Sequence, residues 1–470
     1  MSVLNEKRTA LWALAISSAA VFMVTLDNLV VSTALPVIRE DLGASLQSLV
    51  WTVNAYTLTF AVLLLTGAAL GDRFGRRRLL AIGLALFTVA SAAAALAPSA
   101  TVLVVARAAQ GVGGAIVMPL TLTILSASMP KEKRTMAIGI WGGIAGLAVA
   151  LGPVVGGAIV DGISWHWIFW VNVPIGLVLV PLALRKLDES HGPAAALDLK
   201  GLALGSAGLF SLVWGVVRSQ DLGWSSGEVV FTLAAGAIGV VLFVLWELWT
   251  DEPMLPMRLF TTNRTFAAAN TATFLMYVGF FGAVFLITQY WQFAHGYSPL
   301  GAGLRILPWT VMPIFIAPLA GAAATKIGER PLLIAGLGLL AFSIAWLGFV
   351  STPNAAYTSI LPALLVGGVG SSLFWAPAAS IVLSAVKPEE EGIASGANNS
   401  IRELGGVFGV AILTTIFSGR GSFASPQAFV DGMQPAFYVG AAILAVATLA
   451  AVALPRRQRA SAALEPALAA

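Results

Sequence analysis

The sequence predicts an all-α integral membrane protein with fourteen transmembrane helices. Of its 470 residues, 58% are hydrophobic and only 10% are charged, and the mean hydropathy is +0.89. Soluble domains carry about 25% charged residues, so this composition is far outside their range. The apolar residues also fall into runs of about 18 to 25, each long enough to cross a hydrocarbon core of roughly 30 Å as a helix.

Charged residues and turn signals divide the chain into fourteen such runs. The first run is too long for the apolar region of a signal peptide and lacks a clean cleavage site, so we interpret it as an uncleaved first helix. The predicted spans are 10–35, 46–67, 79–97, 101–127, 135–160, 166–184, 200–218, 228–248, 266–292, 303–324, 331–350, 357–385, 393–417 and 434–455.

The basic residues indicate how the spans are oriented. Twenty of the 26 lysines and arginines fall in the N-terminal segment, in alternate loops and in the C-terminal tail. Cytoplasmic loops hold the excess of lysine and arginine in membrane proteins. Both termini are therefore expected in the cytoplasm, which requires an even number of spans.

The same composition excludes several classes of function. The chain has no cysteine, which rules out disulfides and thiolate metal sites, and its three histidines lie far apart, so we expect no metal and no cofactor. The net charge of +4 is spread over short loops and forms no basic face for nucleic acid. No lysine follows a glycine, which excludes the phosphate-binding element of an ATP-driven pump.

An internal repeat organises the spans into two halves. The loop segment 68–78 (AALGDRFGRRR) aligns with 321–331 (GAAATKIGERP), with Gly75 over Gly328. The two copies are eight spans apart, whereas two six-helix halves would place them six apart. We therefore expect two inserted helices, and we divide the chain into a six-helix bundle (1–187), a linker with two helices (188–265), a second six-helix bundle (266–455) and a cytoplasmic tail (456–470).

Five motifs, in order along the chain, carry a family resemblance. They are LDNLVVSTALP (26–36), LGDRFGRRR (70–78), RAAQGVGGA (107–115), LGPVVGG (151–157, with Gly152, Pro153, Gly156 and Gly157) and WHWIFWVNVPIG (165–176). With them the sequence resembles the major facilitator superfamily, and within it the drug:proton antiporters with fourteen spanners. It departs from the family pattern at Ala68, Ala148 and His166.

The resemblance implies the major facilitator fold and a proton-coupled antiporter that exports amphipathic drugs or antibiotics by alternating access. Its partners would be a lipophilic cationic or neutral small molecule, protons and membrane lipid, and the protein would act as a monomer in a bacterial cell membrane. A secondary transporter dedicated to one metabolite or nutrient on the same fold is the alternative, because fold does not decide substrate.

Charges inside the hydrocarbon core are the main candidates for function, because each is costly there and needs a use or a partner. Asp27 lies about 17 residues from the inner start of its helix, and Arg107 about six from the outer start of its own, so both fall in the outer half of the bilayer. Either Asp27 titrates and Arg107 couples its proton to transport, or the two form a static ion pair. Gln110, one turn from Arg107, is expected to support them by hydrogen bonding.

The second half carries a similar group in the span 393–417. Glu403 is the second candidate proton site, with a local ion pair to Arg402 as the alternative. The pairs Asn398 and Arg402, and Asn399 and Glu403, are each four residues apart and so share a helix face. We expect Asn398, Asn399 and Arg402 to line a cavity or to join the halves.

Other polar residues are candidates for the cavity or for the cytoplasmic gate. Each cavity candidate also has a plain interhelical hydrogen bond as its alternative. Asp72 and Arg73 are expected to latch neighbouring helices when the cytoplasmic side closes, whereas a simple basic loop explains the arginines but not Asp72. The cavity candidates are Asn54, Tyr56, Asn270, Gln289 and Gln292, and the gate candidates are Asp72, Arg73, Gly75 and Arg77.

Overall fold

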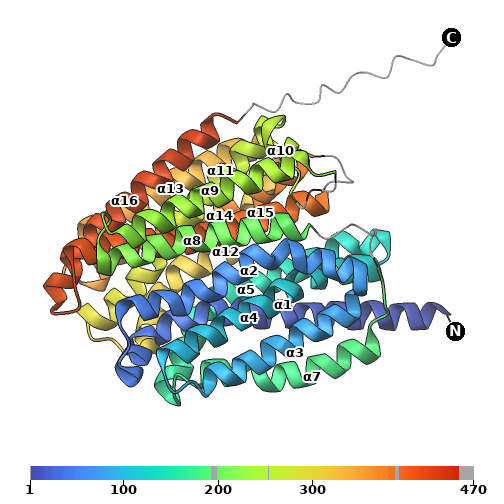
Figure 1. Ribbon diagram of the computed structural model, residues 1–470, viewed down its shortest axis with the longest axis horizontal. Helices are drawn as coiled ribbons and strands as arrows, with labels where there is room; N and C mark the ends of the chain where they lie inside the picture. The colour runs from blue at the N-terminus through green and yellow to red at the C-terminus, as the bar shows by residue number, and fades with distance from the viewer. Residues whose placement is uncertain (1, 192–197, 252, 254, 387–390, 455–470) are drawn as a thin grey trace, which may run out of the picture.

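The computed structural model describes residues 2–191, 198–251, 253, 255–386 and 391–454 as a bundle of long helices (Figure 1). Within these residues, thirteen helices are long and apolar enough to cross a membrane. The two arms of α5, bent by 44° between Ile140–Ala148 and Leu151–Gly162, make a fourteenth span. The predicted all-α membrane fold is therefore confirmed.

The first half of the chain forms one bundle, in which α2 and α3 pack against α4, α1 packs against α5, and α7 packs against α3. Its helices are α1 (Ser2–Leu42), α2 (Leu46–Phe74), α3 (Arg76–Ala95), α4 (Ala100–Ser128), α5 (Lys131–Gly162), the short α6 (Trp167–Trp170) and α7 (Asn172–Lys186).

The last part of the chain forms the second bundle, in which α13 packs against α14 and α16, and α11 packs against α15. Its elements are α10 (Arg258–Thr261), α11 (Arg264–Gln289), the π-helix η1 (Tyr290–Ala294), α12 (Pro299–Ile327), α13 (Glu329–Val350), α14 (Tyr357–Ser384), α15 (Glu391–Arg420) and α16 (Pro426–Val452).

Between the bundles, α8 (Leu199–Leu222) and α9 (Gly227–Trp249) form an antiparallel pair. Helix α8 packs against α2 of the first bundle and α15 of the second, which also pack against each other. Aromatic contacts join α8 to α2, where Trp51 lies 5.5 Å from Trp214 and 6.0 Å from Phe210 between ring centroids. The pair therefore contacts both bundles at their junction.

Two glycines mark the same turn in the two bundles. Gly75 separates α2 from α3 with φ of 103°, and Gly328 separates α12 from α13 with φ of 87°. Side chains with a Cβ rarely adopt this region, so each tight turn between consecutive helices requires glycine. These are the two positions that the internal repeat aligned.

Candidate functional site

Asp27 and Arg107 meet in the interior of the first bundle. Asp27 projects from α1 and Arg107 from α4, and both side chains are fully buried. Arg107 Nη1 lies 2.5 Å from Asp27 Oδ2, as a charge-assisted hydrogen bond. An isolated charge in such a place would be costly, and pairing offsets part of that cost.

Two side-chain amides complete the shell around the carboxylate of Asp27. Asn172 Nδ2 donates to Asp27 Oδ1 at 2.7 Å, and Gln110 Nε2 donates to the same oxygen at 3.2 Å. Gln110 also accepts from Arg107 Nη1 at 3.0 Å and donates to Ser91 Oγ at 2.7 Å. The network (Asp27, Ser91, Arg107, Gln110 and Asn172) therefore ties α1, α3, α4 and α7 together.

The guanidinium of Arg107 is held from its other side by α2. Its Nε donates to the carbonyl of Thr52 at 3.2 Å, and its carbon lies 4.2 Å from the ring centroid of Tyr56. Tyr56, for which a cavity position and an interhelical hydrogen bond were both open, is buried, stacks on Arg107 and donates through its hydroxyl to the carbonyl of Val24 in α1 at 3.2 Å. Arg107 Nη2 is buried without a hydrogen-bond partner in the described structure.

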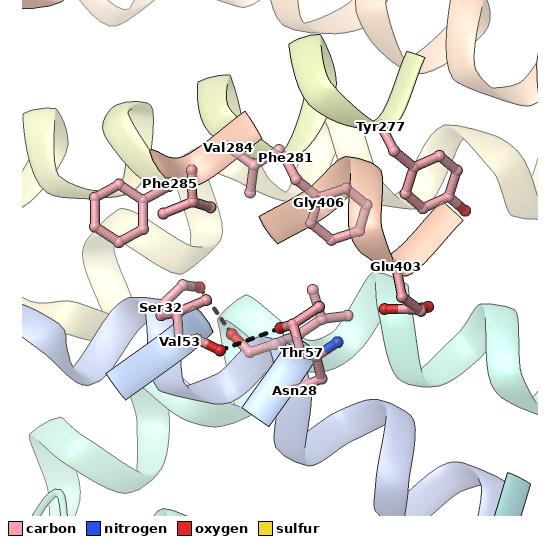
Figure 2. A pocket seen from close by; sticks show the side chains of 12 residues that line it. Asn28, Ser32, Val53, Thr57, Tyr277, Phe281, Val284, Phe285, Glu403 and Gly406 are labelled. Carbon is pink, nitrogen blue, oxygen red and sulfur yellow. Dashed lines mark hydrogen bonds between the residues drawn. The ribbon is translucent and has the colours of Figure 1, made fainter. Parts of the chain in front are cut away.

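A pocket lies between the two bundles, lined from below by α1 and α2 and from above by α11 and α15 (Figure 2). Asn28 and Thr57 face Glu403 across it, and the rings of Tyr277 and Phe281 form its opposite wall. Its volume is about 40 Å³, which holds a few water molecules but not a drug-sized ligand. Among the site residues predicted from the sequence, Glu403 is the one that lines this pocket.

Glu403 also pairs with its neighbour. Arg402 Nη2 lies 3.4 Å from Glu403 Oε1, and the guanidinium lies 5.5 Å from the ring centroid of Tyr277. The carboxylate is 14% exposed and the arginine 31%, so this pair is less enclosed than the pair in the first bundle. Glu403 therefore pairs with Arg402 and lines the pocket at the same time.

Several of the predicted polar residues are buried or half-buried and do not line this pocket. Asn398 Nδ2 donates to Asn270 Oδ1 at 3.0 Å, which joins α15 to α11. Asn54 and Gln289 are also buried, and in the described structure neither side-chain amide has a partner. Asn399 is half-buried.

Gln292 makes an interhelical hydrogen bond, which was the alternative to a cavity position. Its Nε2 donates to the carbonyl of Thr33 at 2.9 Å, so it joins η1 of the second bundle to α1 of the first. A second contact between the bundles lies near this one, where the guanidinium of Arg39 is 4.1 Å from the ring centroid of Phe423. By the predicted orientation, both contacts are at the extracellular end.

At the LGPVVGG motif, α5 of the first bundle closely approaches α12 of the second. A Cβ built on Gly157 would lie 2.4 Å from the carbonyl oxygen of Pro299, and one built on Gly303 would lie 2.3 Å from that of Pro153. Only glycine allows α5 and α12 to approach at this distance. Within α5, Pro153 lacks a backbone donor, and its ring conflicts with a normal helical turn, which accounts for the 44° bend just before it.

The same motif packs against α1 through its other two glycines. A Cβ on Gly152 would lie 2.6 Å from that of Leu29, and one on Gly156 would lie 2.5 Å from Thr33 Oγ1. Nearer the N-terminus of α5, Gly142 and Gly143 are exposed, and nothing lies within 4 Å of the position a Cβ would take. The two bundles are thus in close contact where α5 meets α12, at the end that the predicted orientation places outside, and Gly142 and Gly143 lie apart from this contact.

The loop between α2 and α3 makes its contacts within the first bundle. Asp72 Oδ1 accepts from Arg76 Nε at 2.7 Å, four residues along the chain, and the guanidinium carbon of Arg73 lies 5.6 Å from the ring centroid of Phe74. In this state Asp72 forms a local ion pair, and the described contact of Arg73 is with the ring of its neighbour Phe74.

The connector after α7 covers the same loop. Glu189 Oε2 lies 3.5 Å from Arg77 Nε, and its Oε1 accepts from the backbone N–H of Arg77 at 2.9 Å. A Cβ on Gly75 would lie 2.8 Å from the carboxylate carbon of Glu189. Gly75 therefore allows both the turn and the close approach of this carboxylate.

No group of three or more histidine, cysteine, aspartate or glutamate side chains within the described residues could hold a metal ion. The polar groups described above are hydrogen-bond donors, carboxylates and aromatic rings. They are suited to binding protons and organic molecules and to joining helices.

Comparison with known proteins identifies the family. The family model of the Major Facilitator Superfamily matches residues 17–251 and 269–469. A tetracenomycin C resistance and export protein of Streptomyces glaucescens is 34% identical over 89% of this chain and 78% of its own length. A cephamycin export protein of Amycolatopsis lactamdurans is 36% identical over 95% of this chain and 93% of its own length. A solved POT family transporter superposes with a TM-score of 0.69 at 14% identity, over 93% of this chain and 94% of its own. The chain belongs to the major facilitator superfamily.

Proposed function

We propose that this protein exports amphipathic organic compounds, such as antibiotics or other drugs, from the cytoplasm in exchange for protons. The family consists of membrane transporters, and the relatives above are named for the export of two different antibiotics. The observation that carries the proposal is a buried ion pair in one bundle beside a pocket that both bundles line, with a second carboxylate in it. This arrangement fits exchange at a site between two halves that move against each other.

The Asp27 network is the proposed site of proton coupling. Its carboxylate accepts from Arg107, Gln110 and Asn172, so one negative charge orients donors from two other helices. A proton on Asp27 would remove that charge and weaken the charge-assisted bonds. Arg107 would then be free to move relative to α1, which gives protonation a direct effect on helix packing.

The pocket beside this network is the proposed start of the substrate site. Glu403 supplies a negative charge, and Tyr277 and Phe281 supply aromatic faces, which attract organic cations and pack against apolar groups. Because the pocket has a volume of only about 40 Å³, a drug needs additional space from movement of the bundles. We propose that the substrate enters from the cytoplasmic side, where the open part of α5 lies.

The loop between α2 and α3 is proposed to contact the second bundle in the other conformation, which is open to the outside and closed to the cytoplasm. When the extracellular contact between α5 and α12 opens, the cytoplasmic ends of the bundles approach. Arg73, which packs on its neighbour Phe74 in this structure, is then available to contact the second bundle.

The test uses inside-out vesicles that carry the protein and an imposed proton gradient. A panel of lipophilic cations, neutral antibiotics and zwitterions is added, and collapse of the gradient is recorded for the native protein and for Asp27→Asn. We expect collapse with some compounds in the native protein and a loss of that response in Asp27→Asn. The matched control is Asp161→Asn, because Asp161 is exposed at the end of α5.

The outcomes separate proton coupling from substrate range. Collapse that persists in Asp27→Asn contradicts the assignment of the coupling site. If no compound of the panel collapses the gradient in correctly oriented protein, broad drug export is wrong and a transporter dedicated to one metabolite becomes the better hypothesis.

A further inference from the structure

A groove of about 510 Å³ lies outside the transport site, where α15 and α16 meet the turn between α8 and α9. Ile412, Ile416, Gly419 and Arg420 line it from α15, Val439 lines it from α16, and Trp224 lines it from the turn. The spacing of the α15 residues places them on one helix face. The turns that join α8 to α9 and α15 to α16 lie at the same end of the molecule (Figure 1).

The groove is lined mainly by apolar groups, and one cation lies at its end. Arg420 is exposed at the last residue of α15, and no side chain in the described part of the chain pairs with it. Two other arginines near helix ends have partners, since Arg218 of α8 pairs with Glu228 and Arg39 of α1 stacks on Phe423. From Arg420 to Ile412 the helix face runs for about 12 Å at 1.5 Å per residue.

We propose that this groove binds a phospholipid of the outer leaflet, with its phosphate at Arg420 and one acyl chain along Ile412, Ile416 and Val439. Guanidinium groups bind phosphate oxygens through charge-assisted hydrogen bonds. Pockets that hold small molecules have volumes of about 300–1,000 Å³, and this groove lies within that range. Both helices are candidate membrane spans, so their outer surface meets lipid.

The bound lipid would join the inserted helix pair to the second bundle. Thr415, which also lines the groove, donates through its hydroxyl to the carbonyl of Val216 in α8 at 3.3 Å. Trp224 covers the groove from the turn that follows α8. Since α15 also carries Glu403, the lipid contacts a helix of the transport site without entering its pocket.

The experiment measures binding of dioleoylphosphatidylglycerol to delipidated full-length protein in detergent. Native mass spectrometry gives the dissociation constant, and the midpoint of thermal unfolding gives the stabilisation. We expect Arg420→Gln to weaken binding about tenfold or more, which corresponds to the loss of a hydrogen bond to a charged group. Ile416→Trp, which fills the groove, should reduce the stabilisation with Arg420 in place.

A matched control and three outcomes keep the proposal testable. Lys326→Gln removes the same charge at an exposed position on the other side and should bind lipid as the native protein does. Equal binding by Arg420→Gln and the native protein overturns the proposal. Stabilisation by inorganic phosphate alone to the same extent overturns the role of the acyl chain, and competition by a transported drug assigns the groove to substrate instead. Each variant is first compared without lipid, so that a folding defect is recognised.

Discussion

The substitution Gly157→Ala tests whether the contact between α5 and α12 holds the extracellular end closed. The added methyl would lie 2.4 Å from the carbonyl oxygen of Pro299 and 2.6 Å from the α-carbon of Leu300, where ordinary contact begins at 3.4 Å. Because these atoms are backbone, the helices must separate by about 1 Å. Overpacking of this kind costs about 1–3 kcal/mol.

That cost falls only on the conformation in which α5 and α12 are in contact. By the predicted orientation, this is the conformation closed to the outside. A difference of about 1–3 kcal/mol changes the ratio of the two conformations by roughly 5- to 150-fold. We therefore expect Gly157→Ala to shift the population toward the state that is open to the outside.

The chain has no native cysteine, so a single introduced cysteine reports on this shift without background. We place it at Gly143, which is exposed with nothing within 4 Å, and measure its labelling by an impermeant maleimide from the cytoplasmic side. Labelling should slow in Gly157→Ala. The matched control is Gly162→Ala in the same helix, where a Cβ has open space.

One result would refute the reasoning. If Gly157→Ala is folded and Gly143→Cys is labelled at the rate found in the control, then the close approach of α5 and α12 does not determine which end is open.

Three further predictions concern stability. The side chain of Asn172 donates to Asp27 at 2.7 Å, and hydrogen bonds to charged groups contribute about 1.5–3 kcal/mol. Asn172→Ala should therefore lower the unfolding midpoint, and an unchanged midpoint would contradict the network. Burial lowers the pKa of His295 from 6.5, so the unfolded chain binds the proton more readily, and stability should fall as the pH drops below about 6.5; His295→Gln should show less of this loss in a pH series of unfolding midpoints. Asp198 caps α8 and accepts from Trp246 Nε1 at 2.7 Å, so Asp198→Ala should lower the free energy of unfolding by about 1–2 kcal/mol. A native-like unfolding midpoint would show that the cap contributes little.

The spans and the central ion pair could be predicted from the sequence because the bilayer constrains both. A helix must be long and apolar to cross, and a charge inside the bilayer must find a partner. Asp27 and Arg107 were the two charges expected at the same depth, and the structure brings them together at 2.5 Å.

Amide residues were harder to place than charges. The side-chain amide of an asparagine or glutamine in a span can form hydrogen bonds with many different neighbours. Its position in the sequence therefore does not identify its partner. Asn172 was missed although it lies within the quoted motif WHWIFWVNVPIG. Gln292 was left open between a cavity position and an interhelical hydrogen bond, and in the structure it makes the hydrogen bond. Asn28 next to Asp27 was the available signal for the pocket, because adjacent residues on a helix point about 100° apart.

One segment of α1 connects the proposed functions through direct contacts. Within seven residues it places Asp27 in the buried network, Asn28 in the pocket, and Leu29 and Thr33 against the glycines of α5. The carbonyl of Thr33 also accepts the hydrogen bond from Gln292 across the two bundles. A helix in a close-packed interior transmits a shift at one of these residues to the others, because its backbone hydrogen bonds resist stretching over two turns. Protonation of Asp27 can therefore affect both the pocket and the contact between α5 and α12 through α1 itself. Coupling does not require a longer pathway through other helices.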